Sequence, residues 1–150
     1  MNGPSLSAVE AWEALFRVQV ALLRRFKRNF KGAEISLGEY DVLYNLRLFP
    51  GNRLRLHELN EHILLSQPSL SRLIARMVAA GLVRRERDPV DGRGTLVVMT
   101  EHGAEVQRRV GREHAVAITR YVGGALTTDE LHELRRLCEK LRAGQADLPD

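Results

Sequence analysis

The chain has 150 residues, the length of one typical domain, and 44% of them are hydrophobic, enough for one core. The formal net charge of +4 favours an anionic partner, and the lack of any long apolar run argues against a membrane-spanning helix. The N-terminus lacks a basic stretch followed by an apolar one, and Cys138 is the single cysteine. We therefore expect neither a signal peptide nor an intrachain disulfide, and we place the protein in the cytoplasm.

The N-terminal segment has the pattern of one long helix. The capping box Ser7-x-x-Glu10 is expected to start this helix, which continues towards Lys31. Its apolar seam recurs with alternating four- and three-residue spacing and contains one polar residue: Trp12, Phe16, Gln19, Leu23, Phe26 and Phe30. This spacing is typical of a helix that packs on other helices.

Two shorter helices are expected next. The capping box Ser36-x-x-Glu39 starts the first, which ends before Pro50-Gly51-Asn52. The segment from Leu54 to Leu65 then places apolar residues at helical spacing. Its connection to Ser66 is short enough for a helix-turn-helix.

The segment from Ser66 to Ala80 predicts a helix suited to reading DNA. Ser66 can cap it, Pro68 is tolerated in the first turn, and Gly81 supplies a left-handed stop. One face is an apolar stripe of Leu70, Leu73, Ile74 and Met77. The first turns expose short hydrogen-bonding side chains that can reach bases and phosphates: Gln67, Ser69, Ser71 and Arg72.

Beyond Gly81 the apolar pattern changes to that of two short strands. Leu82 to Arg87 and Thr95 to Met99 flank a loop that contains Pro89 and two glycines, as expected of a two-stranded wing. From Ser66 to Arg93 six arginines stand against three acidic residues. This local excess favours an anionic partner, although a merely solvated basic face would have the same composition.

The C-terminal part predicts two more helices. A long helix follows Thr100 and ends at Gly123-Gly124, and the last helix opens with Thr127-x-x-Glu130. The last helix carries one apolar seam, made of Leu131, Leu134, Cys138 and Leu141. The first and last helices have more apolar surface than one small lobe can cover. We therefore expect a symmetric homodimer, with two reading helices about 34 Å apart on a palindromic operator.

At these residues the chain resembles the MarR family of bacterial winged helix-turn-helix regulators. The resemblance covers nearly the whole chain. It is carried by the serine-rich helix, the Gly-Leu-Val-basic run, the Asp-Pro-x-Asp-x-Arg wing and the Thr-x-x-Gly exit, which stand here as Ser69 to Leu73, Gly81 to Arg85, Asp88 to Arg93, and Thr100 to Gly103. The departures are mild: Met77 to Ala80 stands where Leu-Glu is common, Met99 replaces Leu, and Asn60 replaces a small Ala.

The resemblance implies a mainly α fold within one domain, residues 1–150. A winged helix-turn-helix lobe with a two-stranded β-wing spans 36–100, and dimerisation helices span 5–31 and 101–143. It implies a sequence-specific, DNA-binding transcriptional regulator, most simply a repressor, that acts as a homodimer. Neither a cofactor nor a metal is expected.

The candidate DNA contacts have distinct roles. The amino end of the Ser66 helix can hold a phosphate while Gln67 and Arg72 read bases. In the resembled family the wing Arg, here Arg93, enters the minor groove and the matching Asp91 orients its guanidinium. The full predicted set is Ser66, Gln67, Pro68, Ser69, Ser71, Arg72, Arg76, Arg84, Arg85, Asp91 and Arg93, and Arg87 is a further candidate for phosphate contact.

A small-molecule effector is a second expected partner. Members of the resembled family often bind small aromatic acids in a crevice between the dimer helices and the DNA lobe. Trp12, Phe16, Tyr40 and Asp41 are the candidate ligand residues here, although core packing explains the three aromatic residues as well. The alternative is a constitutive or architectural DNA-binding protein without an effector.

The sequence gives little support to an enzymatic function or to a metal site. His57 and His62 resemble a zinc-protease motif, but their i, i+5 spacing leaves them roughly 140° apart on a helix. His102, His114 and His132 are isolated in sequence and could join Glu or Cys138 only across a dimer. Because some relatives of the resembled family sense zinc, that option stays open. Cys138 lies on an apolar seam, where a free cysteine is most often a buried hydrophobe rather than a redox sensor.

Overall fold

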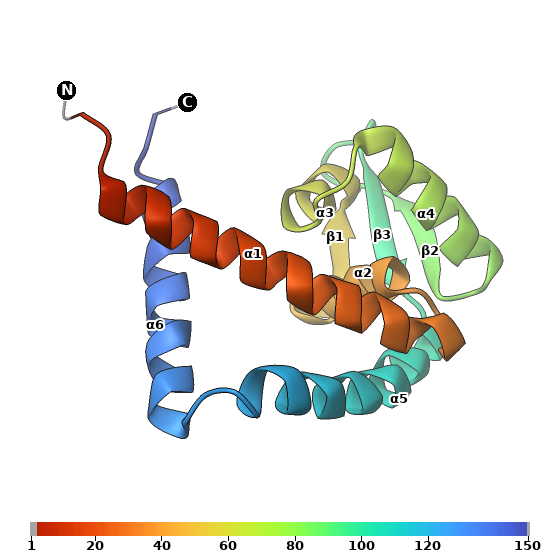
Figure 1. The fold of residues 1–150 in the computed structure, drawn as a ribbon. Helices are drawn as coiled ribbons and strands as arrows, with labels where there is room; N and C mark the ends of the chain where they lie inside the picture. The colour runs from red at the N-terminus through yellow and green to blue at the C-terminus, as the bar shows by residue number, and fades with distance from the viewer. Residues whose placement is uncertain (1–2, 150) are drawn as a thin grey trace. The chain divides into compact units, whose positions relative to one another are not determined.

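The computed structural model describes residues 3–149, which are mostly helical with a small antiparallel sheet (Figure 1). The chain divides into two compact units, residues 1–113 and 114–150. The first unit holds the predicted DNA lobe and the N-terminal helix, and the second holds the C-terminal helix. Within the described residues, no helix is both long and apolar enough to cross a membrane.

Helix α1 spans Leu6–Asn29 and is followed by the short helix η1, Phe30–Gly32. Its N-cap is Ser5, whose Oγ accepts a hydrogen bond from the Ala8 amide at 3.3 Å. The predicted Ser7–Glu10 capping box is therefore wrong, because Ser5 already caps the helix and Ser7 lies within its first turn. No residue of α1 is buried, whereas Phe30 is buried and packs against Tyr40 with ring centroids 5.7 Å apart.

Helix α2 spans Leu37–Arg47, and its predicted capping box is confirmed. Ser36 Oγ accepts from the Glu39 amide and Glu39 Oε1 accepts from the Ser36 amide, each at 3.1 Å. The helix buries four side chains in the core, those of Tyr40, Val42, Leu43 and Leu46. It leads into the short helix η2, Pro50–Asn52.

A short strand that the sequence analysis missed comes next. Strand β1 spans Arg53–Arg55 and helix α3 spans Leu56–His62, so the predicted start of this helix at Leu54 is wrong. Leu54 is buried between two half-exposed arginines, which is the alternation of a strand. Its backbone pairs with Val97 in the middle of strand β3.

The helix-turn-helix and wing are confirmed. Helix α4 spans Gln67–Ala79, β2 spans Val83–Arg87 and β3 spans Thr95–Met99. The three strands form an antiparallel sheet in the order β1-β3-β2, flanked by α3 and α4 (Figure 1). The core of the lobe lies between this sheet and the buried faces of α2 and α4.

Helix α5, Glu101–Ile118, packs against the lobe through its first half. Gly103 is required there, because a Cβ at this position would lie 2.1 Å from the Leu82 carbonyl oxygen. Thr100 Oγ1 accepts from the Gly103 amide at 3.0 Å, which fixes the start of the helix against the Gly81–Leu82 turn. The glycine of the Thr-x-x-Gly motif is thus explained by the close approach of the Leu82 carbonyl.

The second unit contains the end of α5, a π-helical turn and helix α6. The turn spans Thr119–Gly123 with Gly124 as its C-cap, and α6 spans Thr128–Gln145. The predicted Thr127–Glu130 capping box is confirmed. No residue of α6 is buried, and its exposed large apolar side chains are Leu134, Leu137 and Leu141. Cys138 is exposed too, contrary to its expected burial, because the apolar seam of α6 is uncovered in the single chain.

Candidate nucleic-acid interface

The amino end of α4 is built by a serine cap. Ser66 Oγ accepts from the Ser69 amide at 3.3 Å, and Pro68 stands in the first turn, where a missing amide costs no helical hydrogen bond. Gly81, with φ of 74°, ends the helix as predicted. Because Pro68 has no amide hydrogen and the Ser69 amide is capped, the amides of Ser66 and Gln67 are those of the helix start that can bind an anion.

A chain of hydrogen bonds runs along the exposed edge of this first turn. Ser66 Oγ donates to Ser69 Oγ at 2.9 Å, and Arg72 Nη2 donates to the same Ser69 oxygen at 3.2 Å. Ser69 is partly buried by these contacts. Arg72 is thus held along the helix in the free protein, with its other guanidinium hydrogens available to a base or a phosphate.

The two faces of α4 are as the sequence predicts. Leu70, Leu73, Ile74 and Met77 are buried in the core. The predicted contact residues of α4 and its cap are exposed, apart from Ser69: Ser66, Gln67, Pro68, Ser71, Arg72 and Arg76. The polar face is therefore free to meet a partner while the apolar face anchors the helix.

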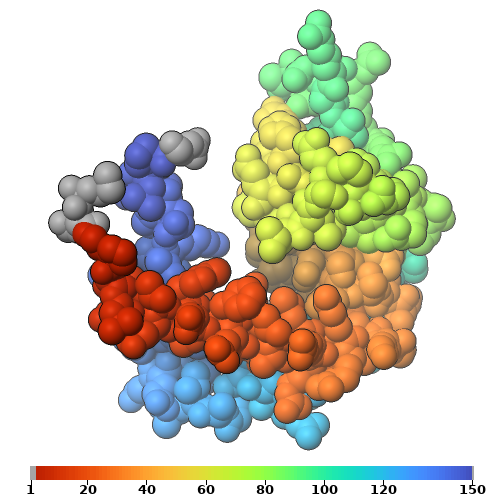
Figure 2. Space-filling model, turned by 45° about the horizontal axis from the view of Figure 1, so that its top comes forward, coloured from red at the N-terminus to blue at the C-terminus, as the bar shows by residue number. Residues whose placement is uncertain are grey.

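The wing is closed by hydrogen bonds at its tip. The Asp88 amide donates to the Gly94 carbonyl at 3.0 Å, and the Gly94 amide donates to the Asp91 carbonyl at 2.9 Å. The tip stands out from the rest of the lobe (Figure 2). Arg93 and Asp91 are both exposed there.

Asp91 acts differently from the expected role. Its carboxylate accepts from the backbone amide of Arg93 at 3.1 Å, an Asx-type contact within the turn. No ion pair between Asp91 and the Arg93 guanidinium occurs in the part of the chain that the structure describes. Asp91 thus shapes the backbone of the wing tip and leaves the Arg93 side chain free to reach outwards.

The base of the wing depends on a residue pair that the sequence analysis missed. Asp88 is only 2% exposed, and its carboxylate accepts from Arg55 Nε of β1 and from the Val90 amide at 2.9 Å. The Arg55 hydrogen bond, followed by that from Val90, lowers the pKa of Asp88 below its usual value. The Asp88 carboxylate thus joins the loop of the wing to the edge strand.

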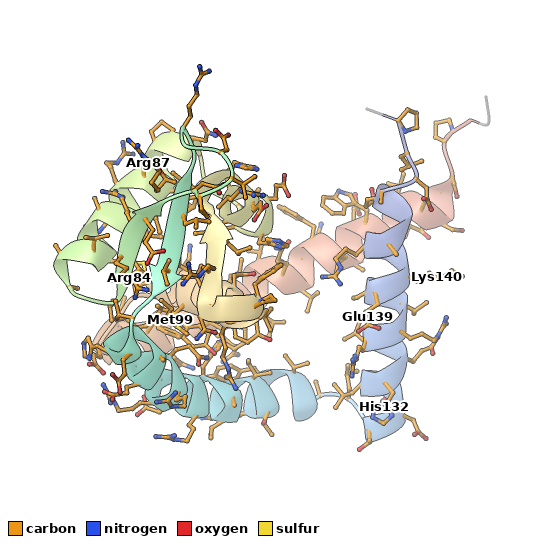
Figure 3. The ribbon with its side chains drawn as sticks, turned by 180° about the vertical axis from the view of Figure 1, so that it is seen from behind. Arg84, Arg87, Met99, His132, Glu139 and Lys140 are labelled. Carbon is orange, nitrogen blue, oxygen red and sulfur yellow. The ribbon has the colours of Figure 1, made fainter. Side chains whose placement is uncertain are left out.

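The arginines of β2 divide between the two faces of the sheet. Arg84 lies on the face of Glu86, Leu96 and Val98, as the strand register requires, and its Nε donates to Glu86 Oε1 at 2.9 Å. Arg53 Nη1 donates to the other oxygen of Glu86 at 3.1 Å. Arg85 points to the opposite face, that of the core and α4, and is exposed. Arg84 lies near the base of the hairpin, whereas Arg87 lies nearer its tip (Figure 3).

Comparisons with known proteins agree with this architecture. A model of the MarR family matches residues 34–94, which include α2, the helix-turn-helix and the wing tip. The HTH-type transcriptional regulator TtmR of Methylorubrum extorquens (strain PA1) is 28% identical over 91% of this chain and 70% of its own length. The crystal structure of AbsC, a MarR family transcriptional regulator from Streptomyces coelicolor, is 28% identical, covers 99% of this chain and 100% of its own, and superposes with a TM-score of 0.80.

Residues 34–94 thus match the MarR family, and along nearly its whole length the chain is similar to transcriptional regulators of that family. Another MarR family transcriptional regulator, Sco3205 from Streptomyces coelicolor, was solved in complex with DNA. It is 26% identical, covers 96% of this chain and 91% of its own, and has a TM-score of 0.79.

The predicted ligand residues fall into two groups. Trp12 and Phe16 pair on α1 with ring centroids 5.8 Å apart, and both are at least half exposed. Tyr40 is buried in the core, in agreement with core packing as the alternative to ligand binding. Asp41, the next residue of α2, is half-buried. Burial raises the pKa of Asp41 to about 6.

Tyr40 takes part in a polar link between α2 and α5. Its hydroxyl is hydrogen-bonded by the buried Gln107, whose Oε1 accepts from Arg47 Nη1 at 3.3 Å. Burial, the larger effect, raises the pKa of Tyr40. Gly111 fits against this hydroxyl, since a Cβ there would lie 3.2 Å from it. The packing and hydrogen bonding of Tyr40 therefore account for this residue without a bound ligand.

Within one chain, no three His, Cys, Asp or Glu side chains of residues 3–149 gather closely enough to hold a metal ion. His57 lies at the start of α3 and His62 at its end. The His62 ring packs against Phe49, with ring centroids 5.4 Å apart.

Proposed function

We propose that this chain is a MarR family regulator, a sequence-specific DNA-binding repressor that acts as a homodimer on a palindromic operator, with binding modulated by a small ligand. One observation carries the DNA-binding part. A capped helix end presents Gln67, Ser71 and Arg72 to solvent beside a wing whose tip exposes Arg93. Such a pair of elements fits adjacent grooves of B-DNA.

The roles divide by element. Gln67 and Arg72 read base edges in the major groove, while the free amides of the α4 amino end and Ser71 hold backbone phosphates. Arg93 enters the minor groove, where a narrow groove has the most negative potential. Arg76 and Arg85 approach phosphates, whereas Arg84 serves mainly the ion pairs of the sheet. The DNA complex of the relative Sco3205 supports a DNA partner for this chain.

The homodimer is supported by the uncovered apolar faces. We infer that residues 36–100 form the DNA-binding lobe and that residues 5–31 and 101–143 supply the dimerisation helices. In a single chain Trp12 is 60% exposed, and α6 exposes three leucines. Apolar surface of this extent favours burial against a second copy, and a twofold axis makes the two lobes match a palindrome.

The ligand part of the proposal rests on Trp12, Phe16 and Asp41. An exposed aromatic pair offers a stacking surface, and a half-buried carboxylate with a pKa of about 6 offers a hydrogen-bonding group whose charge changes near neutral pH. Tyr40, buried in the core, precedes Asp41 on α2. The regulator acts by binding, without a catalytic step.

Fluorescence anisotropy tests the DNA-binding part. Purified protein is titrated into labelled DNA from upstream of its own gene and into a scrambled duplex, and both titrations are repeated across salt concentrations. Preferential binding to an operator, with affinity that falls steeply with salt, is expected of a regulator that displaces several counterions. If neither that DNA nor any duplex selected from a random pool is preferred over the scrambled control, sequence-specific binding is wrong.

A second measurement separates a ligand-responsive regulator from a constitutive DNA-binding protein. Aromatic acids are added to the preformed complex, and release of the labelled operator is followed. Release by an acid that also raises the melting temperature of the free protein supports an effector site.

A further inference from the structure

A small pocket lies between α3, α4 and the wing on the proposed DNA-binding side. Its volume is about 240 Å³. Its lining comes from all three elements and consists of Leu56, His57, Asn60, Gln67, Leu70, Ser71, Arg93 and Thr95. Six of these eight side chains carry a polar group that can donate a hydrogen bond, and none is acidic.

Asn60 is the unusual member of this lining. Its Oδ1 is buried and has no hydrogen-bond partner among the described residues. The residue as a whole is half-buried and lines the pocket, so its Nδ2 is a hydrogen-bond donor at the pocket wall. An unpaired buried polar atom destabilises the fold, and a small apolar residue here would avoid that cost. An asparagine that is costly to the fold points to a function for its donor.

The position of the pocket indicates its occupant. If α4 lies in the major groove and Arg93 in the neighbouring minor groove, the DNA strand that separates the grooves must pass between them. The pocket lies on this path, since α4 and the wing form two of its walls. The passing strand brings a phosphodiester anion, which matches a lining of donors with one arginine and no carboxylate.

We propose that this pocket binds one phosphate of the DNA backbone in each half-site, and that His57 and Asn60 of α3 contact it together with Ser71 of α4. Leu56 and Leu70 supply an apolar floor beneath the adjoining sugar. The proposal rests on the proposed function, because it needs DNA on the face of α4 and the wing. It adds α3 to the interface, which the sequence analysis had confined to α4 and the wing.

The test uses an operator selected from random duplexes with the full-length wild-type protein. Each phosphate in turn is replaced by an uncharged methylphosphonate, and affinity is measured by anisotropy. One position per half-site is expected to weaken the wild type about tenfold, the scale of a charge-assisted hydrogen bond. Asn60→Ala and His57→Ala should bind the unmodified operator several-fold more weakly and lose little more at that position, because the contact is already gone.

Two further variants keep the result interpretable. Asn60→Asp is nearly isosteric and brings a negative charge into the pocket, so its loss of affinity should exceed that of Asn60→Ala. His62→Ala removes a histidine of the same helix that does not line the pocket, and it should bind as the wild type does. In thermal denaturation, Asn60→Ala should melt at or above the wild-type temperature, which a purely structural role for Asn60 would not allow.

The outcomes distinguish a failure of the phosphate pocket from a failure of the proposed DNA-binding function. If the wild type selects no duplex, both proposals are wrong. If it selects an operator but the Asn60 and His57 variants bind equally well, or lose as much as the wild type at every methylphosphonate, only the phosphate site is wrong. Millimolar inorganic phosphate at constant ionic strength should not displace the operator. Displacement from the wild type but not from Asn60→Ala would reassign the pocket to a free anion.

Discussion

Arg55 of β1 donates a hydrogen bond from its Nε to the buried carboxylate of Asp88, across 33 residues of sequence. The same carboxylate accepts a hydrogen bond from the Val90 amide, and the Asp88 amide donates one to the Gly94 carbonyl. The short edge strand thus braces the base of the wing. The wing tip that carries Arg93 is therefore anchored to β1 as well as closed by its own turn.

Replacing Asp88 by Asn should loosen the wing and change the response to acid. The pKa of Asp88 is lowered in the fold, so its charged form stabilises the folded state above the ordinary pKa of 3.8. That contribution is lost as the pH falls through the lowered value. Melting temperatures measured towards low pH should therefore fall less steeply in Asp88→Asn than in the wild type. Parallel curves for the two proteins would contradict this role.

Asp41 should affect the pH dependence of stability in the opposite direction. Burial raises its pKa to about 6, so the fold favours the protonated form, and stability decreases as the pH rises from about 3.8 to about 6. Asp41→Asn removes that penalty. We expect it to stabilise the protein at pH 7 by about 1–3 kcal/mol in urea denaturation, with little gain near pH 4. An equal effect at both pH values would show that the carboxyl does not titrate in this way.

Arg93→Ala should weaken operator binding strongly while dimerisation is unchanged. The side chain lies at an exposed tip and belongs to none of the ion pairs seen in residues 3–149, so its loss removes a DNA contact without disturbing the fold. We expect a loss of at least tenfold in anisotropy titrations at low salt. Sedimentation equilibrium serves as the control for the dimer. An unchanged affinity would remove Arg93 from the interface.

Arg84 and Arg85 form a matched pair of neighbours on opposite faces of β2. Arg85 is exposed on the side of α4, whereas Arg84 is paired with Glu86 on the other face. Arg85→Ala should weaken binding to all DNA sequences and reduce the salt dependence by about one counterion. Arg84→Ala should leave both unchanged. Equal losses for the two variants would mean that the strand register does not decide which arginine meets DNA.

The parts of the fold that the sequence predicted are those with local causes. The capping boxes at Ser36 and Thr127, the cap at Ser66 and the stop at Gly81 each depend on a few neighbouring residues. The wrong predictions have two sources. The first is local ambiguity: both Ser5 and Ser7 can serve as an N-cap, and the backbone conformation decides between them.

The other failures concern contacts between distant segments. Strand β1 has three residues and exists because β3, more than 40 residues later, pairs with it. The Arg-Leu-Arg alternation was the available signal, but it also fits the helical spacing that begins at Leu54. The Arg55–Asp88 contact and the pocket around Asn60 likewise need α3, β1 and the wing in place before any residue in them can be assigned a role.

The apolar face of α6 should decide the oligomeric state. Leu134 is 41% exposed, and His132, two residues earlier, lies about 200° away around the helix, on the opposite face (Figure 3 labels His132). Leu134→Glu places a charge in the proposed dimer interface and should give a monomer in sedimentation experiments at micromolar concentration, with operator affinity reduced because one lobe binds one half-site. His132→Glu adds the same side chain to the other face and should remain a dimer. If both variants stay dimeric with full affinity, the seam of α6 lies outside the interface, and the exposed aromatic residues of α1 become the place to look for it.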